Sequence, residues 1–558
     1  QKGVYLLYIS PLKALNYDIE RNLRVPLEGI AAQLRADGID PPEITIGVRT
    51  GDTPSKERAR MARRPPQILI TTPESLNLIL CSQARSMLRE VRQVVVDEIH
   101  ALAPNKRGAF LSVLLERAEE IAKQSPVRIG LSATQRPLEE TARFLGGYGP
   151  DGSQRAVTIV DASMRRDIEV SVSSAVPDFY GLKQGELWPH IEASLLGEIQ
   201  SHRSTIVFAN NRRTVERLTL NLNEQAGSRI AEPHHGSISP ARRRQTEERL
   251  KRGELRAAVA TSTLELGIDM GAVDLVVQVE APPSVASGLQ RVGRAGHQVG
   301  EPSRGRIFPK HRADLLEAAV VVARMDEGLV ESTRFLRNPL DVLAQQIVAM
   351  CAVDEWSVPR LHDLLRTTAP FRQLSRPVLD AVLDMLAGRY PSEEFAELRP
   401  RIVWDRLADT VVARKGGQHL AVTSGGTIPD RGLFGVFLAG AEGPGRRVGE
   451  LDEEMVYESR VGETFLLGAS TWRIEDITFE RVVVTPAPGQ PGKMPFWHGD
   501  RPGRPLELGM AMGAFVREIR AAPRAQADAT LREQHDLDQW ASDNLLRYLD
   551  DQAAATGV

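Results

Sequence analysis

The sequence has little of three things: cysteine, long apolar runs and excess positive charge. Its two cysteines, Cys81 and Cys351, lie far apart without metal-ligand spacing, which excludes a disulfide framework and favours a reducing, cytoplasmic compartment. No apolar run approaches the ~18 residues of a membrane span and no signal peptide is seen, so no membrane association is expected. The 70 Lys and Arg residues nearly balance the 73 Asp and Glu residues, so nucleic acid would have to bind in a local groove.

Short apolar runs alternate with helical stretches through residues 1–326. The runs are VYLLYIS, EITIGV, QILITT, QVVVDEI and VRIGLSAT, followed later by STIVFAN, AAVATS and DLVVQVE. Alternation of this kind predicts parallel β-sheets covered by helices. We therefore expect an α/β fold with two tandem domains, residues 1–166 and 167–326, the second opening with a linker over 167–185.

The pattern changes after residue 326. Residues 327–400 are mainly helical around short polar turns, which predicts a small helical or winged-helix module. From residue 401, short strands lie between Gly-rich turns, as in HLAVTSGGTIP, LFGVFLAG, FLLGASTWRIEDI and RVVVTPAPG. Residues 401–558 are therefore expected to form a twisted, mostly antiparallel sheet or barrel, with helices at the C-terminal end.

The stretch VVVDEIH ends an apparently buried strand on two adjacent carboxylates, Asp97 and Glu98. In open α/β sheets, ligands bind at the carboxyl ends of the strands. An aspartate there can hold Mg²⁺ through water, and a neighbouring glutamate can orient or deprotonate an attacking water. A solvated strand end is the alternative interpretation of the same two residues.

Two more motifs follow strands and carry small or flexible residues. In LSAT, the hydroxyls of Ser132 and Thr134 could sense a neighbouring carboxylate site, although a simple polar turn is the alternative. In ATSTLELGIDMG, Gly267 and Gly271 bracket Asp269. Tight glycine turns let the backbone approach a phosphate, while an aspartate can accept a hydrogen bond from a ribose hydroxyl.

The motif QRVGRAGH, which starts at Gln290, is the most specific of the set. Arg291 and Arg294 are three residues apart, so both should project from one helical face. Two guanidiniums on one face are costly unless an anion lies opposite them. Arginine fingers meet this need by stabilising the charge on a transferring γ-phosphoryl group, whereas a surface basic patch is the alternative.

In this order, on two tandem α/β domains, the motifs resemble those of superfamily 2 helicases. DEIH corresponds to motif II, SAT to motif III, TIVFANNRR to motif IV, ATSTLELGID to motif V and QRVGRAGH to motif VI. ISPLKALNYD and TTPESL correspond to motifs Ia and Ib. The DEIH form, the ending RAGH, and the later LLGASTWRIEDI and VTPAPGQPGKMPFWHGDRPGRPLELG make the chain similar, over nearly its whole length, to the Lhr (large helicase-related) family.

This resemblance implies two RecA-like lobes, a winged helix and a β-rich fourth domain. It also implies an ATP-dependent, 3′-to-5′ translocase on single-stranded DNA that unwinds DNA or RNA:DNA duplexes in DNA repair. By this resemblance, Asp97 would bind Mg²⁺ and Glu98 would activate the attacking water. ATP would be contacted by His100, Gly267 and Asp269, and its γ-phosphate by Gln290, Arg291 and Arg294. Ser132 and Thr134 would couple the nucleotide site to the nucleic-acid strand.

The nucleic-acid strand should be held by cations, small hydroxyls and backbone amides at strand-to-helix turns. The candidates in the motifs are Lys13, Thr72, Ser75, Arg212, Arg213, Gly236, Ser237 and Thr261, each of which alone is also compatible with a solvated turn. For base contacts, Trp497 in MPFWHGDRPGR is flanked by prolines, glycines and arginines, which favours a stacking platform over a core residue. Ile428 in GGTIPDRG, at a Gly-rich loop tip, is a candidate wedge.

One family motif is absent from the sequence: the phosphate loop G-x-x-x-x-G-K-[ST]. The nearest stretch, GQPGKM, has prolines, the wrong spacing and no hydroxyl. The family carries this loop before ISPLKAL, so we expect an internal piece of a longer helicase that hydrolyses ATP poorly by itself.

Two rival functions are a non-catalytic nucleic-acid clamp and a remodelling ATPase on the same lobes. The intact QRVGRAGH motif argues against the clamp, and the sequence upstream of residue 1 would decide it. Stimulation of the ATPase by single-stranded more than by duplex DNA would discriminate against the remodelling ATPase.

Overall fold

The computed structural model forms two compact units, and each combines a lobe with a later part of the chain. One unit comprises Gln1–Ala162 and Ser332–Pro429, and the other comprises Ser163–Glu331 and Asp430–Val558. The structure describes residues 3–133, 135–161, 167–183, 185–266, 273–296, 302–389, 399–423, 425–428, 432–440, 446–468, 470–478, 481–495 and 503–557. Within these ranges no helix is long and apolar enough to cross a membrane.

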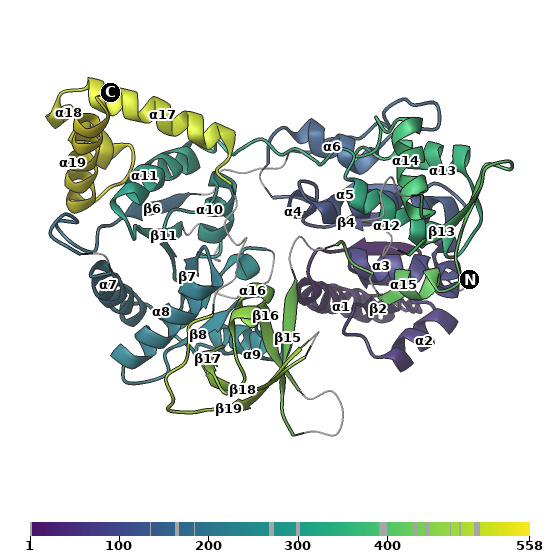
Figure 1. Cartoon of the computed structure of the whole chain (residues 1–558), viewed down its shortest axis with the longest axis horizontal. Coiled ribbons are helices and arrows are strands. Elements are labelled where there is room, and N and C mark those ends of the chain that lie inside the picture. Colours follow the sequence, from purple (N-terminus) through teal and green to yellow (C-terminus); the bar gives the residue numbers. More distant parts are fainter. Residues whose placement is uncertain are drawn as a thin grey trace. The chain divides into compact units, whose positions relative to one another are not determined.

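The first unit is built on a five-stranded parallel sheet in the order β2-β3-β1-β4-β5. Strands β2 and β4 of this sheet are labelled in Figure 1. The strands of the sheet are β1 (Leu6–Ile9), β2 (Ile46–Arg49), β3 (Ile68–Thr71), β4 (Gln93–Val96) and β5 (Val127–Gly130). They coincide with the five predicted runs, so the predicted parallel sheet is confirmed. Apolar β-branched residues fill the central strands because helices cover the sheet.

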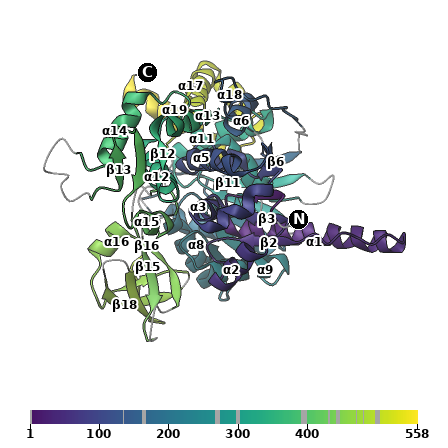
Figure 2. The ribbon, with the colours of Figure 1, turned by 90° about the vertical axis from the view of Figure 1, so that its right-hand side faces the viewer.

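Six helical segments lie between these strands, and a seventh, α6, follows β5. They are α1 (Lys13–Ala36), α2 (Ser55–Arg63), α3 (Pro73–Leu80), the 3-10 helix η1 (Gln83–Glu90), α4 (Ile99–Leu102), α5 (Lys106–Ile121) and α6 (Leu138–Gly146). Figure 2 shows α1 extending well beyond its own sheet. α3 begins where it does because Thr72 accepts a hydrogen bond from the Ser75 backbone and Pro73 occupies the first turn.

The same unit contains a winged-helix module. It consists of α12 (Leu340–Cys351), β12 (Trp356–Ser357), α13 (Val358–Thr367), α14 (Arg376–Leu386), β13 (Ile402–Asp405), β14 (Thr410–Ala413) and α15 (Gly417–Thr423). β14 pairs with both β12 and β13, so the three-stranded sheet continues past residue 400, where the sequence had placed a domain limit. The predicted strand in HLAVT is wrong: it forms α15, which packs on α12 through Leu420 and Ala421, because these apolar residues lie on one helical face.

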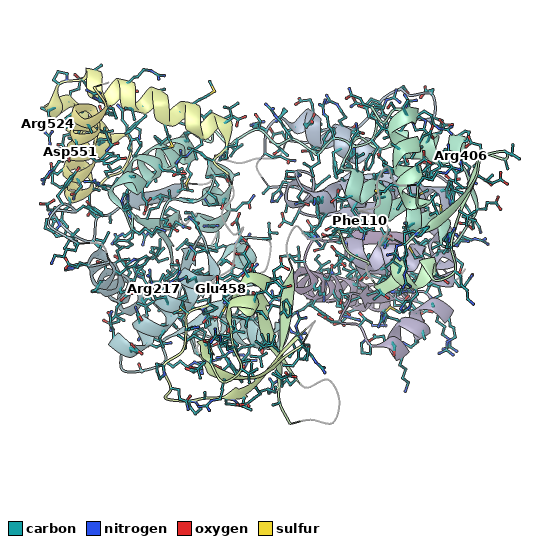
Figure 3. All side chains as sticks on the ribbon, in the orientation of Figure 1. Phe110, Arg217, Arg406, Glu458, Arg524 and Asp551 are labelled. Atoms are coloured by element: carbon teal, nitrogen blue, oxygen red, sulfur yellow. The ribbon has the colours of Figure 1, made fainter. Side chains whose placement is uncertain are left out.

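The first lobe and the winged-helix module share one apolar core. Phe110 on α5 is fully buried in it (Figure 3), together with Leu343 on α12 and Phe371 beyond α13. A buried polar cluster adjoins this core. Arg117 on α5 donates to Asn77 on α3 (3.1 Å) and to Gln346 on α12 (2.9 Å).

The second unit holds a six-stranded parallel sheet in the order β6-β11-β10-β7-β9-β8. Its strands are β6 (Ile168–Val172), β7 (Thr205–Ala209), β8 (Ala231–His234), β9 (Ala257–Ala260), β10 (Leu275–Val279) and β11 (Ser303–Phe308). Its helices are α7 (Leu187–Ser201), α8 (Arg212–Gln225), α9 (Pro240–Lys251), the 3-10 helix η2 (Ser262–Leu264), α10 (Val285–Val292) and α11 (Arg312–Glu327).

Three strands of this sheet were not anticipated. β6 lies inside the segment 167–185 that the sequence analysis assigned to a linker, and that assignment is wrong for its first residues. β6 is an edge strand that alternates apolar and polar residues, and it lacks a continuous apolar run. β8 reads AEPH and contains Pro233, which an edge strand tolerates because it has only one neighbour. β11 reads SRGRIF and is equally polar.

A smaller five-stranded sheet and three C-terminal helices complete the second unit. The sheet order is β16-β15-β19-β18-β17, with three antiparallel pairings and one parallel pairing between β15 and β19. The elements are β15 (Leu433–Leu438), β16 (Arg447–Asp452), α16 (Glu453–Glu458), β17 (Thr464–Leu466), β18 (Thr471–Ile477), β19 (Arg481–Pro486), α17 (Leu506–Ala521), α18 (Arg524–Glu533) and α19 (Gln539–Thr556). The β-rich character predicted from the sequence is confirmed.

The C-terminal helices pack on the second lobe and not on this small sheet. α17 and α19 contact α11 (Figure 1), and Leu537 bridges to Val172 on the edge strand β6. Arg524 and Asp551 mark this helical group in Figure 3. These helices therefore cover an edge of the large sheet that would otherwise be open to pairing.

The small sheet is attached to the second lobe by the loop that follows β8. Glu450 N–H donates to the Ser237 carbonyl (3.0 Å), and Ile238 forms a bridge with Gly449 of β16. A Cβ on Gly449 would lie 2.2 Å from the Ser237 carbonyl oxygen, so only glycine permits this approach. A buried Glu216 carboxylate accepts from Gly468 N–H (2.7 Å) and pairs with His235 (2.9 Å).

Replacing Gln346 by alanine tests whether the first lobe and the winged-helix module unfold as one cooperative unit. The change leaves Arg117 and Asn77 buried with fewer partners, so we expect the free energy of unfolding to fall by about 1–3 kcal/mol. Urea unfolding followed by tryptophan fluorescence measures the loss. Gln33→Ala, at an exposed site on α1, is the control and should change it by less than about 0.5 kcal/mol. Equal stabilities of the two variants would contradict the proposed cooperation.

Candidate functional site

The strands of the first sheet all end in one register, which sets the geometry of the site. Arg49, Thr71, Ile9, Val96 and Gly130 are successive partners across the sheet. The motifs of this lobe begin at or just after four of these strand ends: ISPLKALNYD at Ile9, TTPESL at Thr71, DEIH after Val96 and LSAT after Gly130. Since neighbouring strands lie about 4.8 Å apart, the motifs line one edge in the order of the strands.

Asp97 and Glu98 follow β4 at this edge. The Asp97 backbone N–H donates to the Ile9 carbonyl (2.8 Å), which continues the pairing between β4 and β1. Its carboxylate accepts from the Tyr8 hydroxyl (2.9 Å) and from the Glu98 N–H (2.9 Å). Burial raises the pKa of Asp97, and these two hydrogen bonds oppose the rise. Burial and the charge of Asp97 likewise raise the pKa of Tyr8 above its usual range.

Glu98 has a strained backbone. Its φ of 47° and ψ of 43° place it in the left-handed region, where a residue with a Cβ pays about 1–3 kcal/mol. Such strain is found preferentially at functional sites because the surrounding contacts hold it there. The turn ends β4 abruptly and starts α4, so the two carboxylates leave the sheet at its carboxyl edge.

His100 links the carboxylate pair to the SAT motif. Its Nδ1 lies 3.5 Å from a Glu98 carboxylate oxygen, 3.3 Å from the Ser132 hydroxyl and 3.2 Å from the donating Ala133 N–H. Because Ala133 donates to Nδ1, this nitrogen carries no proton. Burial lowers the pKa of His100 to about 4, which keeps the ring neutral at pH 7. Thr134, the second predicted coupling residue, lies outside the described residues.

The donors at Asp97 fit a magnesium ion. Mg²⁺ prefers carboxylate oxygens and is usually bound by one or two carboxylates together with water and substrate phosphates. No group of three or more His, Cys, Asp or Glu side chains arranged to hold a metal occurs in the described ranges, so Asp97 would act with water and phosphate oxygens. A cation at this position would also offset the burial that raises the pKa of Asp97.

The strand-binding candidates of the first lobe lie at the other end of the same edge. Thr72 and Ser75 follow β3 and are buried at the start of α3. Lys13 follows β1, is about half exposed and pairs with Asp52 (2.8 Å) in the turn after β2. The strand order therefore places Thr72 and Ser75 after β3 and Lys13 after β1, whereas the carboxylates follow β4 and Ser132 follows β5.

Ile428 lies on a loop that is fixed to α3. Asn77 donates to the Gly425 carbonyl (3.5 Å), and a Cβ on Gly426 would lie 3.5 Å from the Glu74 side chain. Glu74 is in the first turn of α3, next to Thr72, so this loop reaches the strand-binding end of the edge. Ile428 itself is 51% exposed, as a wedge would need to be. Trp497, the predicted stacking platform, lies outside the described residues.

Arg291 of the second lobe is held by the lobe itself. Its guanidinium is buried and donates to Glu265 (2.9 Å), Asn210 (2.9 Å) and Gln278 (2.8 Å). α10 ends at Val292, and Arg294 lies in the turn after it. The prediction that the two arginines project from one helical face is therefore wrong. Gln290 is half-buried on α10.

The remaining second-lobe candidates follow β7, β8 and β9, which are neighbours in the sheet. Arg212 and Arg213 begin α8, and Arg213 is exposed. Ser237 is buried and accepts from Arg212 (2.9 Å), so its side chain already has a partner, whereas Gly236 beside it is exposed. Thr261 is half-buried after β9. Gly267 and Asp269 lie outside the described residues.

The sequence analysis missed several residues that hold the site together. Tyr8 holds Asp97, Glu265 holds Arg291, and Arg107 on α5 bridges Glu74 (2.7 Å) and the Pro11 carbonyl (2.8 Å). Burial alone would raise the pKa of Glu74, but Arg107 outweighs it and lowers the pKa. Only the strand order brings these partners together, so no local pattern could have indicated them.

The His100 ring gives a direct test of the link between the two motifs. We expect its NMR signals to titrate with a midpoint of about 4 in the folded protein, against about 6.5 for an ordinary histidine. Since the folded pKa is depressed, the contribution of His100 to stability is complete above pH ~6.5 and falls as the pH drops towards 4. His100→Gln assigns the signal and should remove this component. A midpoint near 6.5 would contradict the buried, neutral ring.

Three family models match the chain. The DEAD/DEAH box helicase model matches residues 1–141, the helicase conserved C-terminal domain matches residues 190–298, and the winged helix domain of the large helicase-related protein matches residues 323–494. The matches follow one another along the chain in the order of the first lobe, the second lobe and the winged-helix module.

Curated relatives extend this similarity over the full chain. A Lhr helicase/probable uracil glycosylase of Mycolicibacterium smegmatis is 51% identical over 100% of the chain and 39% of its own length. A Lhr helicase/uracil glycosylase of Escherichia coli is 49% identical over 92% of the chain and 36% of its own length. The chain thus spans less than half of either relative.

A solved structure agrees with these matches. The structure of Mycobacterium smegmatis helicase Lhr bound to ssDNA and AMP-PNP has a TM-score of 0.82 and 49% identity, covering 100% of the chain and 67% of that protein. At this identity and coverage, the match extends beyond a common fold to a common family. The chain belongs to the Lhr (large helicase-related) family of helicases.

Proposed function

We propose that the chain supplies the core of an ATP-dependent nucleic-acid helicase that moves along single-stranded DNA. One observation carries this proposal. A single sheet edge of the first lobe carries a carboxylate pair after β4 and strand-binding candidates after β1 and β3. ATP hydrolysis at the carboxylate end of this edge can therefore be coupled to binding of the nucleic-acid strand at the other end. The relative in complex with ssDNA and AMP-PNP supports the same pair of ligands.

The proposed chemistry uses a small set of groups. Asp97 would hold Mg²⁺, and Glu98 would orient and deprotonate the attacking water. His100 passes the state of this site to Ser132 through its hydrogen bonds. Arg294 is the arginine finger, and Arg291 is a positioning residue because its guanidinium is committed to Glu265 and two amides.

The finer assignments rest on the family resemblance. They are 3′-to-5′ movement, unwinding of DNA or RNA:DNA duplexes, a role in DNA repair and a cytoplasmic location. We also propose that this sequence alone turns over ATP poorly, because it contains no G-x-x-x-x-G-K-[ST] loop. Gly267 and Asp269 remain the proposed contacts to ATP, Thr134 a coupling residue, and Trp497 the proposed stacking platform.

The arginine pair tests the motor. In a chain that also carries a phosphate loop, Arg294→Ala should lower ssDNA-stimulated ATP turnover by about 10³-fold, as loss of an arginine finger does, with ssDNA affinity nearly unchanged. Arg291→Ala should instead lower the free energy of unfolding by about 3–5 kcal/mol, because Glu265 is left buried without its cation. Steady-state ATPase, DNA titration and thermal unfolding of both variants give the answer. Turnover that is stimulated equally by duplex and single strand would sink the helicase proposal.

Ile428 tests the strand path. Ile428→Ala should weaken binding of an oligothymidylate by about 1–2 kcal/mol, since it removes an apolar side chain that bases would cover. Val422→Ala is the matched control: Val422 is an apolar residue, 45% exposed on α15 of the same unit, and is not among the proposed strand contacts. Fluorescence anisotropy measures both affinities. If the two variants bind alike, Ile428 is a surface residue without a role in binding.

A further inference from the structure

Two arginines beside the proposed strand contacts lack a counter-charge. Arg49, the last residue of β2, is only 8% exposed, and its Nη1 is buried without a hydrogen-bond partner. Arg58 on α2 also has a buried and unpartnered Nε. Throughout the described ranges, no carboxylate lies within ion-pair distance of either guanidinium.

Arg49 and Arg58 belong to two elements that pack against each other, β2 and α2. A Cβ on Gly47 would lie 3.6 Å from Met61 of α2, so this face of β2 packs against α2. Arg49 is two residues further along and shares that face. Burial, and then the nearby charge of Arg58, lowers the pKa of Arg49 to about 10. Arg49 is therefore still a cation at pH 7.

A buried cation next to a second cation is unfavourable by several kcal/mol unless an anion compensates it. The acidic residues nearest in sequence are already paired: Asp52 with Lys13 (2.8 Å) and Glu57 with Arg60 (3.3 Å). The amino-terminal end of α2 adds its own positive potential, since its cap residue Pro54 provides no side-chain oxygen. Among the described residues, therefore, neither of these two nearby carboxylates is left to compensate the arginine pair.

We propose that the Arg49–Arg58 pair, together with the amino-terminal end of α2, is a binding site for a phosphate-type oxyanion. The planar fork of arginine matches such oxygens, which accept several N–H groups at once. The ligand is either a phosphodiester of a bound nucleic-acid strand or free inorganic phosphate. The first source rests on the proposed function.

The position of the site fits a strand phosphate. Arg49 is the partner of Thr71 across the sheet, and Thr72 directly after it begins α3. The turn that follows Arg49 also meets Lys13, since a Cβ on Gly51 would lie 3.1 Å from the Lys13 ammonium nitrogen. The site thus extends the row of candidates after β1 and β3 by one strand, to the sheet edge at β2.

The experiment uses Arg49→Met, which keeps the length of the side chain and removes its charge. Arg60→Met, at the solvent-exposed and Glu57-paired arginine of the same helix, is the matched control. In the first arm, thermal unfolding is compared in inorganic phosphate and in chloride at equal ionic strength. We expect phosphate to raise the midpoint of the wild-type chain and of Arg60→Met, and Arg49→Met to lose this increment while being at least as stable in chloride.

In the second arm, binding of a fluorescein-labelled oligothymidylate is measured against salt concentration. If a strand phosphate occupies the site, Arg49→Met binds about tenfold more weakly, the fold-change expected for one charge-assisted hydrogen bond. The slope of log affinity against log salt should also become shallower by about 0.7. A phosphate effect without a strand effect supports the oxyanion site and overturns the strand as its source.

Other results overturn the proposal. If phosphate and chloride give the same midpoint for the wild-type chain, or if Arg49→Met keeps both the phosphate increment and the strand affinity, there is no oxyanion site. If Arg49→Met fails to fold, the same two measurements are made on Arg58→Met and on the wild-type chain. Loss of the phosphate increment in Arg58→Met then supports the site, and its retention together with unchanged strand affinity overturns it. If the wild-type chain binds no oligothymidylate, the nucleic-acid part of the proposed function fails, while the phosphate arm still tests the site.

Discussion

The common end point of parallel strands is the constraint on which the rest of the first lobe depends. Parallel strands need crossover helices, so every carboxyl end faces the same edge and every turn from strand to helix opens there. In this chain the end points form one unbroken row from Arg49 to Gly130. A displacement of one strand would move its motif away from its neighbours, and the acidic pair would lose Tyr8.

Polar groups inside the lobes hold the charged residues in place. Arg291 is buried, yet three partners accept its hydrogen bonds, which removes most of the cost of burial. The buried His235 likewise pairs with the Glu216 carboxylate. The same carboxylate oxygen accepts a hydrogen bond from the Gly468 N–H, in the turn after β17 of the small sheet. These shared acceptors fix the loop after β8 from two sides. The Glu216 carboxylate thus joins the second lobe to the small sheet.

Much of the fold could be predicted because its central strands carry continuous β-branched runs such as QVVV and TIVFA. The edge strands could not, since β6 alternates apolar and polar residues and β8 contains a proline and two polar residues. For the site, the motif letters indicated Asp97 and Glu98, but partners such as Tyr8 and Glu265 depend on strand order. The prediction that Arg291 and Arg294 project from one helical face was wrong because α10 ends between them, at Val292.

The core shared by the first lobe and the winged-helix module is formed by segments that are distant in sequence. Phe110 and Leu343 pack in one cluster, although the whole second lobe lies between them in the chain. During synthesis, which proceeds from the amino terminus, the apolar surface of α5 must wait until α12 has left the ribosome. The second lobe, whose own core cluster lies within residues 176–308, can close in the meantime. The first lobe is thus synthesised before the second lobe, but its core can be completed only after that of the second lobe.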